Sequence, residues 1–240
     1  ATFTGSAFAD NFGDTANNAG ALTSMTMNGG LGQDSLQGGA GGDVITDTSI
    51  EADLDGNKLD GAGGADTITG GAGEDTIIAG AGNDLINAAA GNDSITLSSG
   101  TNTANAGDGV DTIVAGTGAD TINADGGNDV LTMAGNWTAL DTVNAGDGAD
   151  TATVTVTSAV TTGAATGLET ITATFDSNAD VLALAAITQD LKTLNLVGSA
   201  DNDRADVTGL LSGATVVNTD AQLDTVTIDT VAGATLTADI

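Results

Sequence analysis

Residue types that usually carry enzymatic chemistry are missing from this chain of 240 residues. It has no Cys, no His and no Pro. Without Cys there is neither a disulfide nor a thiol nucleophile. Without His the chain lacks the commonest general base and the imidazole ligand of zinc and copper sites. No G-x-S-x-G motif replaces them, so we predict that the chain is not an enzyme.

Basic and aromatic residues are also scarce. The chain has 33 acidic residues but only three basic ones, Lys58, Lys192 and Arg204, and its formal net charge is −30. This charge repels nucleic acids and anionic lipids, so we expect no nucleic-acid partner. No apolar run is long enough to span a bilayer, which argues against direct membrane insertion. Aromatic residues make up 2% of the chain, and a large conventional core is therefore not expected.

What the chain has instead is a nine-residue repeat. Position four is Gly and position six is Asp in all ten regular copies, and position eight is Leu or Ile in nine of them. These copies begin at Gly29, Gly38, Gly61, Gly70, Ala79, Ala88, Ala106, Ala115, Ala124 and Ala145. Three degenerate copies fill the gaps: Leu97–Asn105, one ending at Asp60 and one ending at Asn144. Thirteen consecutive repeats therefore run from about Gly29 to Thr153.

The order of residues within the repeat predicts its local structure. Positions seven to nine form a short strand whose central aliphatic side chain points inward. Positions one to six form a turn, in which Gly allows unusual backbone angles and close approach of carbonyl groups. Two repeats then make one coil of a right-handed parallel solenoid with a thin inner layer. Residues 10–13 resemble half a repeat and are expected to begin the stack.

Stacking of the coils brings Asp side chains of alternate repeats together at the strand spacing of about 4.8 Å. Like charges so close repel each other unless a cation lies between them. Calcium takes six to eight carboxylate and carbonyl oxygens, whereas magnesium prefers a tighter octahedron and retains water. The sequence therefore predicts about seven to ten Ca²⁺ ions, held by Asp side chains and by the carbonyls of small residues. An alternative is that Asp serves only to form the turns.

The predicted ligands follow from position in the repeat. The side-chain ligands are Asp34, Asp43, Asp66, Asp75, Asp84, Asp93, Asn102, Asp111, Asp120, Asp129, Asp141 and Asp150. The predicted carbonyl donors are Gly71, Gly73, Gly80, Gly82, Gly91, Gly107, Gly109, Gly116 and Gly118. The predicted neighbours on one side are Asp75–Asp93, Asp93–Asp111, Asp111–Asp129 and Asp129–Asp150, and on the other Asp43–Asp66, Asp66–Asp84, Asp84–Asn102 and Asp120–Asp141. Sites that use Asn102, or Asn57 beside Asp34, should be weaker or empty because they lack one charge.

The repeat resembles the RTX nonapeptide, G-G-x-G-x-D-x-U-x, of calcium-binding proteins exported by type I secretion. The resemblance covers about half the chain, although several copies carry Ala at position one or two. It implies a calcium-binding β-roll and an extracellular or bacterial cell-surface location. We therefore predict an all-β chain with N-terminal lead-in strands at residues 1–27 and an RTX β-roll at residues 28–153.

Residues 154–240 lack the repeat but alternate apolar and polar residues in short runs, which predicts further strands. Three segments share a frame: residues 168–171, 191–194 and 223–226. We favour a further parallel β-solenoid, with a small β-sandwich as the alternative. Such frames after RTX blocks look like those of calcium-dependent bacterial S-layer proteins. Residues 199–206 contain three Asp and are either one more calcium loop or a solvated loop.

The sequence therefore favours a calcium-dependent structural protein of the bacterial surface, such as an S-layer subunit or a similar extracellular array. We expect it to fold and self-associate into a lattice or filament when Ca²⁺ binds after export. One alternative is the RTX carrier segment of a secreted protease or lipase, and another is a segment of a large RTX adhesin. Ice binding through Thr triplets is disfavoured, because the triplets do not recur at one period.

Overall fold

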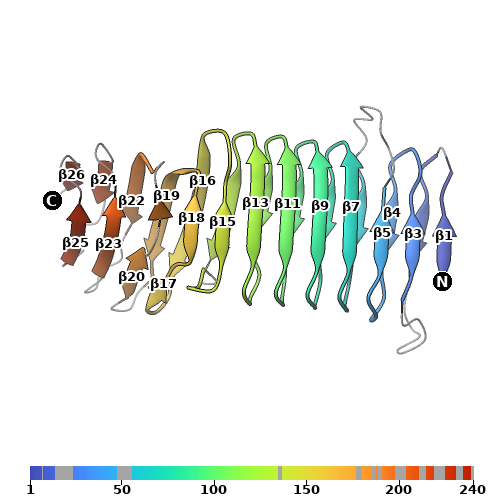
Figure 1. Cartoon of the computed structure of the whole chain (residues 1–240), viewed down its shortest axis with the longest axis horizontal. Coiled ribbons are helices and arrows are strands. Elements are labelled where there is room, and N and C mark those ends of the chain that lie inside the picture. The colour runs from blue at the N-terminus through green and yellow to red at the C-terminus, as the bar shows by residue number, and fades with distance from the viewer. Residues whose placement is uncertain are drawn as a thin grey trace.

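A computed structural model describes residues 1–6, 8–13, 24–47, 56–134, 137–176, 180–184, 187–188, 191–197, 204–210, 215–218, 225–230 and 235–238. These residues contain strands and turns but no helix. Accordingly, the described residues include no helix long and apolar enough to span a membrane. The strands stack along the long axis of the molecule, from β1 near the N-terminus to β25 and β26 near the C-terminus (Figure 1). The predicted all-β parallel solenoid is confirmed.

Three parallel sheets make up this stack. The first sheet contains β1 (Thr2–Thr4), β3 (Thr26–Asn28), β5 (Val44–Thr46), β7 (Thr67–Ala72), β9 (Leu85–Ala90), β11 (Thr103–Asp108), β13 (Thr121–Gly126), β15 (Thr142–Asn144), β18 (Ala164–Thr166) and β21 (Ile187–Thr188). The second contains β2 (Asn11–Gly13), β4 (Ser35–Gln37), β6 (Lys58–Asp60), β8 (Thr76–Ile78), β10 (Ser94–Thr96), β12 (Thr112–Val114), β14 (Val130–Ala134), β16 (Asp150–Val156), β19 (Leu168–Phe175), β22 (Thr193–Val197), β24 (Thr215–Asn218) and β26 (Thr235–Ala238). The third contains β17 (Val160–Thr161), β20 (Val181–Leu184), β23 (Arg204–Leu210) and β25 (Thr225–Thr230).

The repeat sets the register of the two long sheets. Ile77, Ile95 and Ile113 pair across β8, β10 and β12, eighteen residues apart. Successive repeats therefore alternate between the sheets, and two repeats form one coil, as the spacing predicts. The N-terminal half-repeat begins the second sheet, because Phe12 of β2 pairs with Leu36 of β4. Phe12 also stacks on Phe3 of β1, with ring centroids 5.8 Å apart.

The inner layer contains more than one apolar residue per repeat. Strands β7, β9, β11 and β13 continue from positions seven to nine into the first three positions of the next repeat. Ala88, Ala106 and Ala124 at position one are consequently fully buried beside the aliphatic residues at position eight. Positions eight and one are two residues apart along a strand, so both point to the same face. The prediction of a single inward residue was wrong for this reason.

The β-sandwich alternative for residues 154–240 was wrong, because all strand pairs among the described residues of this region are parallel. Two of the three shared frames are equivalent, since Thr170 of β19 pairs with Thr193 of β22. The third frame is not, because Thr225 of β25 pairs with Arg204 in the third sheet. Residues 223–224 of that frame lie outside the described residues. The boundaries at 27/28 and 153/154 remain predictions, and β3 and β16 extend across them.

Candidate metal centre

The repeat Asp residues lie at the ends of the turns, and all of them are buried. At most 3% of any one of them is exposed, and Asp111, Asp129 and Asp150 are fully buried. Asn57 and Asn102 occupy the same place in the degenerate repeats and are buried too. Burial of so many carboxylates is costly unless each is hydrogen-bonded or neutralised by a cation.

One oxygen of each carboxylate has a structural partner in the neighbouring coil. The backbone N–H of each residue in the ladder donates to the Oδ1 atom of the next, at N–O distances of 2.6–3.0 Å. Beside the second sheet the ladder runs Asp10, Asp34, Asn57, Asp75, Asp93, Asp111, Asp129 and Asp150. Beside the first sheet it runs Met25, Asp43, Asp66, Asp84, Asn102, Asp120 and Asp141. The structure thus brings together every predicted neighbouring pair, including Asp34 with Asn57.

The other oxygen divides the turns into two classes. Among the described repeats, Oδ2 is buried without a hydrogen-bond partner in eight Asp residues: Asp34, Asp66, Asp75, Asp84, Asp93, Asp111, Asp129 and Asp150. In all eight repeats the residue at position two has a positive φ. Gly39 and Gly116 at that position do not, and the N–H of Gly39 donates to Asp43 Oδ2 at 2.7 Å. The backbone at position two therefore decides whether the second oxygen stays available to a cation.

Backbone carbonyls of the turns add further oxygens. A methyl group on Gly127 would overlap the carbonyl oxygen of Gly109 and lie 3.3 Å from Asp129 Oδ1. On Gly148 it would overlap the carbonyl oxygen of Gly127 and lie 3.2 Å from Asp150 Oδ1. Within the described part of the chain, no N–H group donates to the carbonyls of Gly109 and Gly127. Carbonyl and carboxylate oxygens of neighbouring coils therefore converge beside position four, which only Gly permits.

The predicted carbonyl donors are not equivalent. Position-four residues stack in two columns, Gly73–Gly91–Gly109 and Gly82–Gly100–Gly118. At position two, Gly71 and Gly107 belong to β7 and β11, and the carbonyl of Gly80 accepts a hydrogen bond from Ser99 at 3.2 Å. The position-four carbonyls are thus the better candidates for metal donors.

Burial also changes the protonation of these carboxyl groups. Desolvation raises the pKa of Asp66 and Asp75 to about 7, and that of Asp93, Asp111 and Asp129 to about 6, from an ordinary value of 3.8. The backbone N–H bonds described above oppose the shift without cancelling it. Desolvation likewise raises the pKa of Asp34, Asp84, Asp120 and Asp150. When these carboxyl groups are ionised, their negative charges are therefore not compensated by the protein, and a bound cation would stabilise them.

The donor set suits calcium better than a metal held by side chains alone. No group of three or more Asp, Glu, His or Cys side chains within the described ranges converges as a metal site would require. Each step offers the carboxylates of two coils, and the rest of a coordination shell would come from backbone carbonyls. Calcium accepts such a mixed oxygen shell. The unpartnered Oδ2 atoms of the Asp residues and the carbonyl oxygens at position four together provide such a mixed oxygen shell.

Sequence reasoning missed two members of the second-sheet ladder. The N–H of Asp150 donates to Glu169 Oε2 at 2.8 Å, and Lys192 lies one coil further on. Glu169 follows Gly167 and precedes Ile171 by two residues each, the same spacing that surrounds Asp in the repeat. That spacing was the available signal. In the predicted Asp-rich loop, residues 199–203 lie outside the described residues, and Asp206 pairs with Arg204 at 2.8 Å.

Comparison with known protein families agrees with this geometry. A family model described as the RTX calcium-binding nonapeptide repeat (4 copies) matches the chain at three stretches, residues 26–46, 60–95 and 96–131. No curated protein and no solved structure matches the chain. RTX repeats bind several Ca²⁺ ions and form a structural, non-catalytic roll that is typical of secreted bacterial proteins. This chain therefore carries RTX calcium-binding nonapeptide repeats, folded as a parallel β-solenoid.

Proposed function

We propose that this chain is a calcium-organised structural protein of the bacterial cell surface, an S-layer subunit or a subunit of a similar extracellular array. The observation that carries the proposal is the pair of ladders of buried carboxylates, in which eight repeat Asp residues keep a second oxygen that has no hydrogen-bond partner among the described residues. In this proposal Ca²⁺ bridges neighbouring coils through the Asp side chains and the position-four carbonyls. Residues 28–153 are then the calcium-binding unit, and residues 154–240 continue the solenoid.

Calcium would also determine when the chain folds, namely after export from the cell. Extracellular calcium modules typically bind at about 10⁻⁴–10⁻³ M, and cytosolic calcium lies far below that range. Inside the cell the carboxylates would repel one another and the roll would stay unfolded, which suits export by type I secretion. Outside the cell, millimolar calcium would bridge the ladders and fold the roll.

The outer face of the first sheet supports self-association. The described residues at positions seven and nine from β7 to β15 of the first sheet are Thr67, Thr69, Leu85, Asn87, Thr103, Asn105, Thr121, Asn123, Thr142 and Asn144. None of them is charged, although the chain carries a net charge of −30. Two copies can therefore meet through this face without strong repulsion.

Electron microscopy of the purified chain at millimolar calcium tests the proposal. Ordered sheets or filaments are expected, and they should disappear when a chelator is added. Magnesium at the same concentration is the matched control and should not support assembly. Monodisperse particles at every calcium concentration would count against an array. They would favour an RTX segment that accompanies a secreted enzyme or belongs to a large adhesin.

A further inference from the structure

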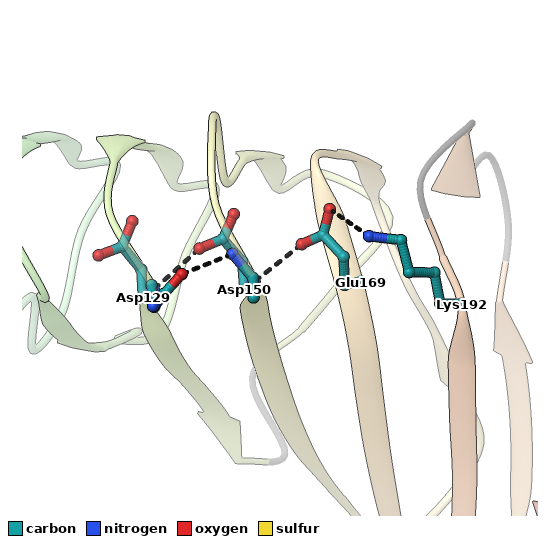
Figure 2. Close-up of polar contacts among 6 residues, drawn as sticks. Asp129, Asp150, Glu169 and Lys192 are labelled. Carbon is teal, nitrogen blue, oxygen red and sulfur yellow. Dashed lines mark hydrogen bonds and ion pairs between the residues drawn. The ribbon is translucent and has the colours of Figure 1, made fainter.

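The ladder beside the second sheet continues beyond the last repeat Asp. The N–H of Asp129 donates to Asp150 Oδ1 at 2.8 Å, and that of Asp150 donates to Glu169 Oε2 at the same distance. The Oε1 atom of Glu169 faces the ammonium group of Lys192, with Nζ 3.7 Å away (Figure 2). The column of acidic residues therefore ends at a basic one.

The turn that presents Glu169 is shorter than the turns of the repeats. Asn144 of β15 and Thr151 of β16 are separated by six residues, 145–150. In the next coil the equivalent strand positions are Thr166 and Thr170, because Thr166 pairs with Asn144 and Thr170 with Thr151. Only residues 167–169 separate them, and Leu168 among these is buried. A cation that needs six to eight oxygens loses half of the backbone carbonyls that a full turn offers.

Lys192 occupies the next place in the column. Its carbonyl accepts a hydrogen bond from the Thr215 N–H at 2.8 Å, as the Asp129 carbonyl does from Thr151 at 2.9 Å. Its own N–H donates to the Glu169 carbonyl at 2.9 Å. The ten regular repeats contain no basic residue, so positive charge for their carboxylates must come from solution. At Glu169, by contrast, the chain itself supplies the positive charge, through the ammonium group of Lys192.

We propose that Lys192 ends the calcium column: its ammonium group is the built-in counter-ion of Glu169 and holds the junction between the roll and the C-terminal strands without a calcium ion. This inference rests on the proposed calcium role of the repeat aspartates. It extends that role by stating where the ions stop and why. The side chain of Glu169 is 14% exposed and that of Lys192 73% exposed, so the pair is partly screened by water.

The test compares Lys192→Met with Lys58→Met in the full chain at saturating calcium. Lys58 lies on β6 of the same sheet and forms no ion pair with any described residue. Hydrogen exchange of β22 should become about two- to fivefold faster in Lys192→Met, the loss expected for a partly exposed ion pair. Additional calcium should not restore it, and the number of bound ions should stay that of the wild type. Lys58→Met should leave β22 unchanged.

Glu169→Gln supplies a second readout, since its amide oxygen can still accept the Asp150 N–H. It should give the same faster exchange, and adding Lys192→Met to it should cause no further loss. If Lys192→Met bound one extra calcium ion, or if added calcium fully restored the slow exchange of β22, this inference would be overturned while the proposed function would stand. Unchanged exchange in both variants would overturn it as well. A wild-type chain that binds no calcium would instead overturn the proposed function.

Discussion

The coils of the repeat region and those beyond Asp150 differ in what holds neighbouring coils together. In the repeat region the second-sheet strands β4, β8, β10 and β12 have three residues each, with one buried side chain. The turns beside them contribute a buried carboxylate per coil, as at Asp93 and Asp111. Each of these short strands therefore buries a single side chain of its own and lies beside a buried carboxylate.

Beyond Asp150 the strands of the second sheet are longer and their inner faces are more apolar. Strand β19 has eight residues and buries Ile171, Ala173 and Phe175, and β22 buries Leu194 and Leu196. The acidic residues Glu169 and Asp206 each have a basic partner. The comparison teaches that one coil geometry can be held by ions from solution or by apolar burial with internal ion pairs. It also predicts opposite responses of the two regions to calcium.

The largest effect is expected from Asp93, because it lies between two steps of the ladder: its carboxylate accepts the Asp75 N–H, and its own N–H donates to the Asp111 carboxylate. Asp93→Ala should abolish two calcium ions and leave the buried Asp75 N–H without an acceptor, at a cost of about 1–3 kcal/mol. Asp93→Asn keeps an acceptor, as Asn102 does, and should weaken the ions without that added cost. Calorimetric titration with calcium measures the loss. Asp206→Ala in the C-terminal region is the control, and an equal loss there would remove the distinction between the regions.

The next largest effect concerns the close approach of coils at position four. A methyl group on Gly109 would overlap the carbonyl of Gly91, and the φ of Gly109 is 151°. Gly109→Ala should therefore cost about 2–4 kcal/mol and weaken calcium binding, because the coils must separate. Gly63→Ala is the matched control, since its methyl group would lie 3.7 Å from the nearest atom. Thermal unfolding at saturating calcium should separate the two variants, and equal melting temperatures would contradict the close approach.

Acid should partly replace calcium in the repeat region. The folded-state pKa is raised from 3.8 to about 7 for Asp75 and to about 6 for Asp93, so folding favours the protonated groups. Their stabilisation of calcium-free protein is fully present below about pH 4 and is lost as the pH rises through 6 to 7. Calcium-stripped protein should therefore show more β-sheet by circular dichroism near pH 4 than near pH 8. Calcium affinity should be lower near pH 4 than near pH 8, because protons compete with calcium for the same oxygens.

The smallest effect is expected where a repeat departs from Gly at position two. Ala89 has a φ of 84°, which is strained for any residue with a Cβ atom. Ala89→Gly should stabilise the calcium-bound chain by about 1 kcal/mol. Ala81→Gly is the control, because Ala81 has no positive φ and should lose about 0.5–1 kcal/mol. Denaturant unfolding at saturating calcium measures both changes, and a destabilised Ala89→Gly variant would contradict the strain.

The strict spacing of the repeat made the ladders predictable. Gly at position four and Asp at position six recur every nine residues, and eighteen residues return the chain to the same sheet, so Asp75, Asp93 and Asp111 had to be neighbours. The two turn classes were not predictable, because Gly39 and Gly71 occupy the same position and differ only in φ. The role of Glu169 was hidden by the shortened turn and by the register shift at Asp150 and Thr151.

Hydrogen exchange of the full chain in chelator and in millimolar calcium tests the central claim most directly. Calcium should slow exchange strongly in β8, β10 and β12, where buried carboxylates lie in the turns beside short strands. Strands β19 and β22 should gain much less protection, because apolar burial and Lys192 hold them. Equal gains in both regions, or repeat strands that stay protected in chelator, would contradict the account.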